Sequence, residues 1–189
     1  MTISNPLTLR RPAGVLGLGA VVLLVCAGVP LAAQHSGAPS QETQRAAMSK
    51  LGFLVGHWSG PVSIVRGPGE PLHLTQTENV QFKLDGLVLL IEGQSTAADG
   101  TVPFKALATI SYEDAAKAYH FRAYHDGAYV DTELTVQPDG FSWGFTSGPA
   151  HIVNTMHLTA AHEWRETTEV TLPNGPPHKS FEMMLKHQP

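Results

Sequence analysis

Cysteine is almost absent from this 189-residue chain, and its one copy, Cys26, lies in an apolar run near the N-terminus. If that run is removed as an export signal, the mature protein has neither disulfide nor thiol chemistry. The motifs of common enzyme classes are missing as well: there is no Gly-x-Ser-x-Gly and no Gly-rich phosphate loop after a strand. The sequence therefore predicts no catalytic residue and favours a protein that is not an enzyme.

Basic residues are also scarce, since 12 Lys and Arg stand against 16 Asp and Glu for a net charge of −4. Loss of Arg10 and Arg11 with the signal would make the mature chain more negative by two. No basic stripe remains, which argues against a nucleic-acid partner. The ten histidines show no His-x-His or His-Glu-x-x-His spacing, so no metal site is predicted.

The N-terminus has the layout of a secretory signal. Arg10 and Arg11 precede an apolar run over residues 15–29, and Ala32-Ala33 offers a cleavage site. Residues 1–33 are therefore predicted to be a cleaved signal peptide that exports the protein to the periplasm or beyond. The alternative is an uncleaved membrane anchor, although the run is shorter than the roughly 20 residues that a spanning helix needs.

Beyond the signal, residues 34–44 are rich in Ser, Gly, Pro and Gln and are predicted to be a flexible linker. Residues 45–189 form the predicted folded domain. Apolar residues near one face indicate a short helix within residues 42–54, limited by Gly52 and Gly56. No membrane span is expected once the signal is cleaved.

From Trp58 onward the hydrophobic pattern has the period of two that is typical of strands. About ten strands are predicted, over residues 58–65, 72–84, 87–95, 102–112, 119–125, 128–137, 141–146, 150–158, 163–172 and 178–187. Their short connections exclude the crossovers that parallel strands need. An open sheet of this size would expose two edges, so closure is favoured.

The predicted fold class is therefore all-β, an antiparallel up-and-down barrel of about ten strands that is preceded by a short N-terminal helix and encloses a cavity. A β-sandwich is the alternative, but it needs longer crossover loops.

The segment from Leu51 to Gly60, which contains Gly56-His57-Trp58, resembles the opening of calycin-type barrels. These include lipocalins, fatty-acid-binding proteins and nitrobindin-type haem barrels. The closest resemblance is to an uncharacterised family of exported bacterial proteins with a lipocalin-like barrel. In calycins the tryptophan packs across the closed end, and a basic residue of the last strand commonly covers it. The resemblance thus implies a structural plug made by Gly56, Trp58 and Lys186, with Lys179 as the other candidate for the basic residue.

The same resemblance implies a barrel that binds a small, partly apolar ligand. Haem is the alternative cofactor, and it would need a histidine that faces the cavity. The chain departs from the nitrobindin-type signature directly after Trp58, where residues 59–63 read Ser-Gly-Pro-Val-Ser.

Alternating positions supply the candidates for the cavity wall. On one predicted strand His120, Arg122 and Tyr124 share a face, and the opposite face carries Phe121, Ala123 and His125. If the polar set points inward, it makes a donor-rich wall suited to a carboxylate or a carbonyl. The alternative is that it faces water, and Tyr129 on the next strand poses the same choice.

The other candidates are polar or adaptable apolar side chains: Trp143, Asn154, Met156, Arg165 and Met183. A carboxylate pair between strands is also conceivable, for example from Glu78 and Glu92. Two further alternatives stay open: an enzyme with a site built from His120, Arg122 and Tyr124, and a barrel packed solid. The sequence leaves the ligand and the oligomeric state open.

Overall fold

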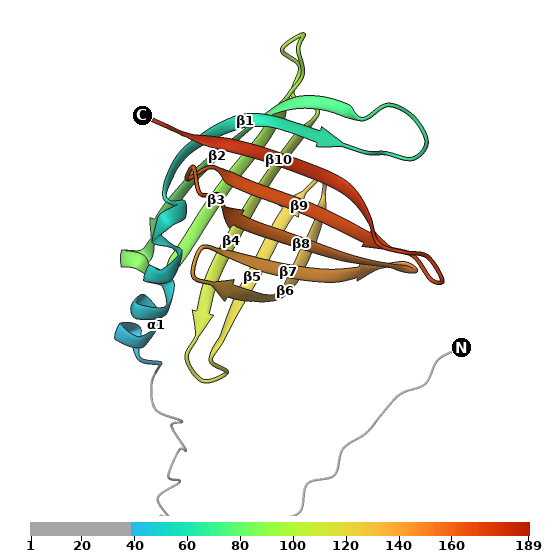
Figure 1. The fold of residues 1–189 in the computed structure, drawn as a ribbon. Helices are drawn as coiled ribbons and strands as arrows, with labels where there is room; N and C mark the ends of the chain where they lie inside the picture. Colours follow the sequence, from blue (N-terminus) through green and yellow to red (C-terminus); the bar gives the residue numbers. More distant parts are fainter. Residues whose placement is uncertain (1–38) are drawn as a thin grey trace, which may run out of the picture. The chain divides into compact units, whose positions relative to one another are not determined.

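A computed structural model describes residues 39–189 of the chain. The predicted signal peptide, and the linker as far as residue 38, lie outside this part. The described residues form a short helical segment followed by ten strands (Figure 1). The helical elements are α1 (Gln41–Met48), η1 (Ser49–Leu54) and η2 (Leu84–Gly86). The strands are β1 (Gly56–Ile64), β2 (Leu72–Lys83), β3 (Val88–Thr96), β4 (Phe104–Glu113), β5 (Ala118–His125), β6 (Ala128–Gln137), β7 (Gly140–Ser147), β8 (Ala150–Leu158), β9 (Trp164–Thr171) and β10 (His178–Gln188).

The strands close into one barrel in which each strand pairs antiparallel with its neighbours in sequence. β1 also pairs with β10, for example Val62 with Met183, and this pairing removes both edges of the sheet. The predicted ten-stranded antiparallel barrel is thereby confirmed. Each strand lies within two residues of its predicted bounds, because turn residues with positive φ, such as Asp126 and Gly127, mark where the pairing ends.

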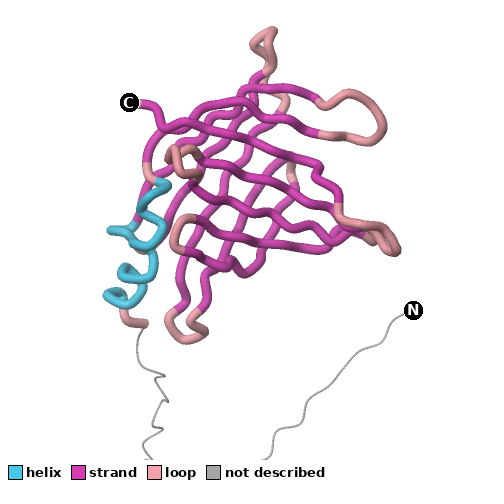
Figure 2. Tube along the Cα trace, viewed as in Figure 1, coloured by secondary structure: helices cyan, strands magenta, loops and turns pink. Residues whose placement is uncertain are grey.

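The helical segment closes one end of the barrel (Figures 1 and 2). Ser40 caps α1 by accepting a hydrogen bond from the Thr43 amide at 3.2 Å, so the helix begins at Gln41. Residues 41–44 are therefore helical and do not belong to the predicted linker. The Tyr119 hydroxyl donates to the Ala47 carbonyl at 2.8 Å, and Arg45 Nε donates to the Asp85 carbonyl at 2.8 Å. These bonds fasten the segment to the β2–β3 and β4–β5 end.

The interior near this segment is tightly packed. Met48, Leu51 and Leu54 are fully buried against the inward side chains of the strands. The buried core is completed by Trp58, Val62, Leu74, Val80, Leu89, Ile91, Ala108, Ile110, Phe121, Leu134, Phe141, Met156, Trp164, Met183 and Leu185. We call α1 and η1 together (residues 41–54) the plug. The opposite end, formed by the β1–β2, β3–β4, β5–β6, β7–β8 and β9–β10 connections, has no such cover among residues 39–189.

Candidate functional site

The half of the barrel away from the plug contains a cavity of about 380 Å³. Inward side chains of β2 to β5 and of β7 to β10 line it, and its mouth lies beside residues such as Phe104 and Phe145 at the uncovered end. Small residues leave the space: Ala106, Ala108 and Ala123 point inward where the packed half has larger side chains. The barrel is therefore solid at one end and hollow at the other.

Aromatic rings make up one side of this cavity. Trp143 lies between Phe121 and Phe145, with ring centroids 4.3 Å and 5.8 Å away respectively. Ile152, Val170 and Met183 extend the same apolar surface. Such a wall gives affinity for apolar groups without requiring a particular orientation.

Another part of the cavity wall is polar and contains a short chain of hydrogen-bonded side chains. Ser95 Oγ donates to Gln76 Oε1, and Gln76 Nε2 donates to Glu78 Oε1 at 2.7 Å. Gly93 pairs with Glu78 across β2 and β3, and a Cβ at position 93 would lie 2.6 Å from Glu78 Oε2. A glycine is thus needed here to leave room for the carboxyl group.

A second acidic side chain, Glu166 on β9, faces the same cavity. Its Oε2 accepts a hydrogen bond from Trp164 Nε1 at 3.1 Å. Burial raises the pKa of Glu166 to about 7. Burial also raises the pKa of Glu78 to about 8; the charge of Glu166 adds to that rise and the bond from Gln76 opposes it. No lysine or arginine of residues 39–189 lines the cavity, so neither acid has a cationic partner there.

Asn154 on β8 adds an unpaired amide to this wall. Its Oδ1 accepts a hydrogen bond from Thr168 Oγ1 at 2.6 Å. Its Nδ2 has no partner among residues 39–189, although the side chain is only 5% exposed. A buried polar group without a partner is uncommon, and a ligand in the cavity could satisfy it. We call Gln76, Glu78, Asn154 and Glu166 the polar floor.

Four of the predicted cavity residues lie on the outer face instead. His120 Nε2 is 3.0 Å from Glu113 Oε2, and Arg122 forms an ion pair with Asp131. Tyr124 and Tyr129 are exposed, the latter by 66%. The apolar alternate set, with Phe121 at its centre, occupies the interior because burying it removes more apolar surface from water. The interpretation of His120, Arg122, Tyr124 and Tyr129 as wall residues is therefore corrected, as is the site built from the first three.

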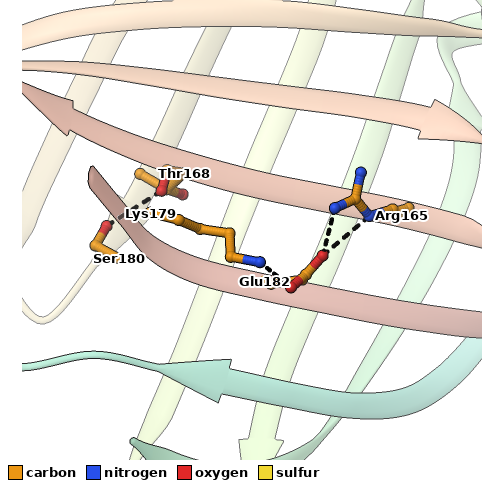
Figure 3. Close-up of polar contacts among 5 residues, drawn as sticks. All are labelled: Arg165, Thr168, Lys179, Ser180 and Glu182. Atoms are coloured by element: carbon orange, nitrogen blue, oxygen red, sulfur yellow. Dashed lines mark hydrogen bonds and ion pairs between the residues drawn. The ribbon is translucent and has the colours of Figure 1, made fainter. Parts of the chain in front are cut away.

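Arg165 does not line the cavity and forms an ion pair with Glu182 instead (Figure 3). Its Nε and Nη2 donate to Glu182 Oε1 at 3.0 Å and 2.6 Å, and Lys179 contacts the other oxygen of the same carboxylate. The bonds from Lys179 and Arg165 hold the pKa of Glu182 below its ordinary value. This ion-pair group lies on the outer surface of β9 and β10, beside the bond from Ser180 Oγ to the Thr168 carbonyl.

Of the remaining residues predicted to line the cavity, three do so and one does not. Trp143, Asn154 and Met183 line the cavity. Met156 is 1% exposed and belongs to the packed half, so it does not line the cavity.

The sequence predicts that Gly56, Trp58 and Lys186 together close one end of the barrel, and the structure differs from this prediction at the basic residue. Trp58 is buried, and its Nε1 donates to the Leu54 carbonyl at 2.7 Å. Lys186 is not its cover, because that side chain is 73% exposed and lies 3.5 Å from Glu163. His187 covers Trp58 instead, with its ring edge-on at 4.9 Å. Gly56, at φ 134°, permits this contact, because a Cβ there would lie 2.2 Å from His187 Nε2.

The polar floor contains residues that sequence reasoning did not assign to the cavity. The sequence suggests Glu92 as a partner of Glu78, but Glu92 is exposed on the outer face and Glu166 is the acid that lines the same cavity as Glu78. The sequence contains a signal for Glu78, since this residue shares one face of its strand with the apolar Leu74, Val80 and Phe82. Glu166 had a weaker signal, because neither face of its strand is cleanly apolar.

Residues 39–189 contain neither a cluster of metal ligands nor a membrane-spanning helix. No group of three or more His, Cys, Asp or Glu side chains could hold a metal ion. No helix in this part of the chain has both the length and the apolar character to cross a membrane.

Comparison with known proteins finds a solved structure with a similar fold but shows no family for this chain. No family model matches the chain, and no curated protein matches it. The solved structure of Rv2717c from M. tuberculosis is similar, with a TM-score of 0.57 and 13% identity over 76% of this chain and 98% of that one. Lobster apocrustacyanin A1 aligns with a TM-score of 0.33 and 9% identity over 78% of this chain and 68% of that one. At these identities the likeness to Rv2717c concerns the fold alone, and the closed ten-stranded barrel fits a calycin-like fold.

Proposed function

We propose that this protein is an exported binding protein that holds one small, partly apolar molecule inside its barrel. The observation that carries the proposal is the cavity of about 380 Å³, which the plug seals at one end and which stays accessible at the other. Its volume falls in the range of roughly 300–1,000 Å³ that is usual for small-molecule sites. The predicted signal peptide over residues 1–33 supports the export part of the proposal.

The composition of the wall supports binding rather than catalysis. Apolar and aromatic side chains such as Phe121 and Trp143 supply affinity, and the polar floor fixes the orientation of the ligand. The mechanism is sequestration, in which the barrel removes the apolar part of the ligand from water without changing its bonds.

Haem is the alternative occupant, and its fit to these residues is poor. His125 is the one histidine of residues 39–189 that lines the cavity. Its side chain is 42% exposed at the mouth, with Nδ1 3.7 Å from Asp126. The floor presents two carboxyl groups to the space that an apolar porphyrin would fill. A Soret band on haem addition that His125→Ala abolishes would favour haem over the ligand proposed above.

Filling the cavity tests the proposal directly. Ala108 points into the cavity, so Ala108→Trp is expected to weaken binding of the fluorescent probe N-phenyl-1-naphthylamine at least tenfold by occupying its space. The neighbouring Leu107 lies on the outer face, so Leu107→Trp adds a similar side chain without this effect and serves as the control. Equal binding by the wild type and both variants would place the probe outside the barrel.

Native mass spectrometry gives a complementary measurement. Protein purified from the periplasmic or secreted fraction of its own host is expected to carry a co-purified small molecule, which Ala108→Trp should exclude. Recovery of the protein only from the cytoplasm would contradict export, and a barrel that neither carries a ligand nor binds the probe would contradict the binding function.

A further inference from the structure

The polar floor of the cavity has more acceptors than donors. Glu78 and Glu166 project into it from β2 and β9, and each receives a single side-chain hydrogen bond, from Gln76 and Trp164 respectively. Ionised carboxylates have about four acceptor positions each, so most of that capacity is unused. Both acids line the same cavity, and the charge of Glu166 contributes to the raised pKa of Glu78.

No lysine or arginine within residues 39–189 lies in the cavity wall to neutralise these acids. The other titratable side chain in the wall, His125, lies at the mouth on β5 and not at the floor. On the far side of the sheet, Arg165 and Lys179 of β9 and β10 are bound to Glu182, and Lys186 of β10 lies 3.5 Å from Glu163. Glu78 is buried and Glu166 is partly exposed within the cavity. Acids in such a site are unfavourable when ionised without a cationic partner, and a ligand that supplies the positive charge would remove that penalty.

Asn154 is a sign, independent of the acids, that the cavity binds a ligand; its unpaired Nδ2 is a donor and would pair with an acceptor atom of that ligand other than the ammonium nitrogen. It is buried in the same wall and one end of its amide has no partner among residues 39–189. Gly93 is a second sign, because the absence of a side chain there keeps the Glu78 carboxyl group free to face the cavity. A cavity evolved only for an apolar molecule would need neither feature.

We propose that the cavity selects an amphipathic amine, whose protonated nitrogen is bound by the carboxylates of Glu78 and Glu166 and whose apolar part lies against Phe121 and Trp143. This proposal rests on the proposed function, since it names the class of ligand for the same cavity. An ammonium group has three donors, which suits a cavity lined by two carboxyl groups. Binding releases to solvent any proton that the free protein holds on these acids, and no covalent bond changes.

The test compares three probes that share one apolar chain and differ in the head group. Octylamine, 1-octanol and octanoate compete with N-phenyl-1-naphthylamine for the intact mature protein at about pH 8. Octylamine is expected to bind at least tenfold tighter than 1-octanol, because a charge-assisted hydrogen bond in a buried site is stronger than a neutral one. Octanoate is expected to bind weakest, since its charge repeats that of the floor.

Substitutions assign the preference to its residues. Glu166→Gln and Glu78→Gln are each expected to lower the octylamine to 1-octanol ratio to about threefold or less, with 1-octanol affinity unchanged. Glu169→Gln, on the same strand as Glu166 but exposed on the outer face, is the matched control and keeps the wild-type ratio.

The outcomes separate this inference from the function on which it rests. Equal affinity of the wild type for octylamine and 1-octanol, or tighter binding of octanoate, overturns the amine inference and leaves a binding barrel. Failure of the probe and of all three competitors to bind overturns both. The octylamine to 1-octanol ratio is measured on the wild-type protein, so the inference can be tested even if the Glu78→Gln protein does not fold.

Discussion

At the scale of single residues, Trp58 joins the plug to the barrel. Its ring meets Trp164 edge-on at 5.8 Å and is covered by His187, while its indole N–H donates to the Leu54 carbonyl. A buried carbonyl that loses its donor keeps the cost of its desolvation. The residue is therefore structural, as its place in the calycin-like pattern implies.

Trp58→Phe isolates that hydrogen bond. We expect it to lower the free energy of unfolding by about 1–3 kcal/mol through the unpaired Leu54 carbonyl and lost contact, measured by urea denaturation. Trp143→Phe is the control, since Trp143 lines the cavity and makes no side-chain hydrogen bond within residues 39–189. A larger loss from Trp143→Phe than from Trp58→Phe would contradict the role given to Trp58.

The choice between inward and outward side chains is also made residue by residue. On β5 the alternation was visible in the sequence, but the polar face with Arg122 and the apolar face with Phe121 both offered plausible walls. The barrel decides for Phe121, since its inner surface is shared with Trp143 of β7. Strand β9 was harder, because Glu166 and Arg165 are both charged, and only the register with β8 and β10 shows which one faces inward.

At the scale of elements, the plug is the helical segment that fills one end of the barrel. Its hydrophobic side chains were visible as a short helical pattern, which predicted a helix within residues 42–54. The structure divides this stretch into an α-helix and a 3-10 helix and starts it earlier, because Ser40 supplies the cap. Met48, Leu51 and Leu54 then fill the end of the barrel.

Leu51→Ala tests how much the plug contributes. Leu51 is fully buried, so its truncation is expected to lower the free energy of unfolding by about 2–5 kcal/mol. Leu172→Ala, at a position 48% exposed, is the control and should change it by less than about 0.5 kcal/mol. If both variants unfolded at the wild-type urea concentration, the plug would be dispensable for the fold.

At the scale of the whole molecule, the barrel combines a packed half with a hollow half whose cavity is lined by two acids. The pKa values of Glu78 and Glu166 are raised from the ordinary 4.5 to about 8 and about 7. The folded protein thus keeps protons that the unfolded chain releases. Stability is therefore fully present below about pH 4.5 for these groups and falls as pH rises toward 8.

The ligand-free protein is accordingly expected to melt at a lower temperature at pH 8 than at pH 5, by on the order of 5 °C, in scanning calorimetry. The double variant Glu78→Gln, Glu166→Gln should show a smaller decrease, because it has no proton to release at either position. A wild-type melting temperature that rises over this range would show that the acids are not buried as described.

The sequence by itself determined the class of fold. Period-two alternation, short turns such as Asp126-Gly127 and the absence of crossover segments leave an antiparallel meander as the consistent arrangement, and ten strands favour closure. These are local properties of the chain, and they do not depend on which residues meet across the barrel.

Only the tertiary structure decided the site. Glu78 and Glu166 are separated along the chain and lie on strands that are not adjacent, so their position in one cavity depends on closure and register. The same is true of His187, which reaches Trp58 through the pairing of β10 with β1. Alternation gives each strand two faces, but the interior is defined by what the other strands contribute, and that sum is a property of the closed barrel.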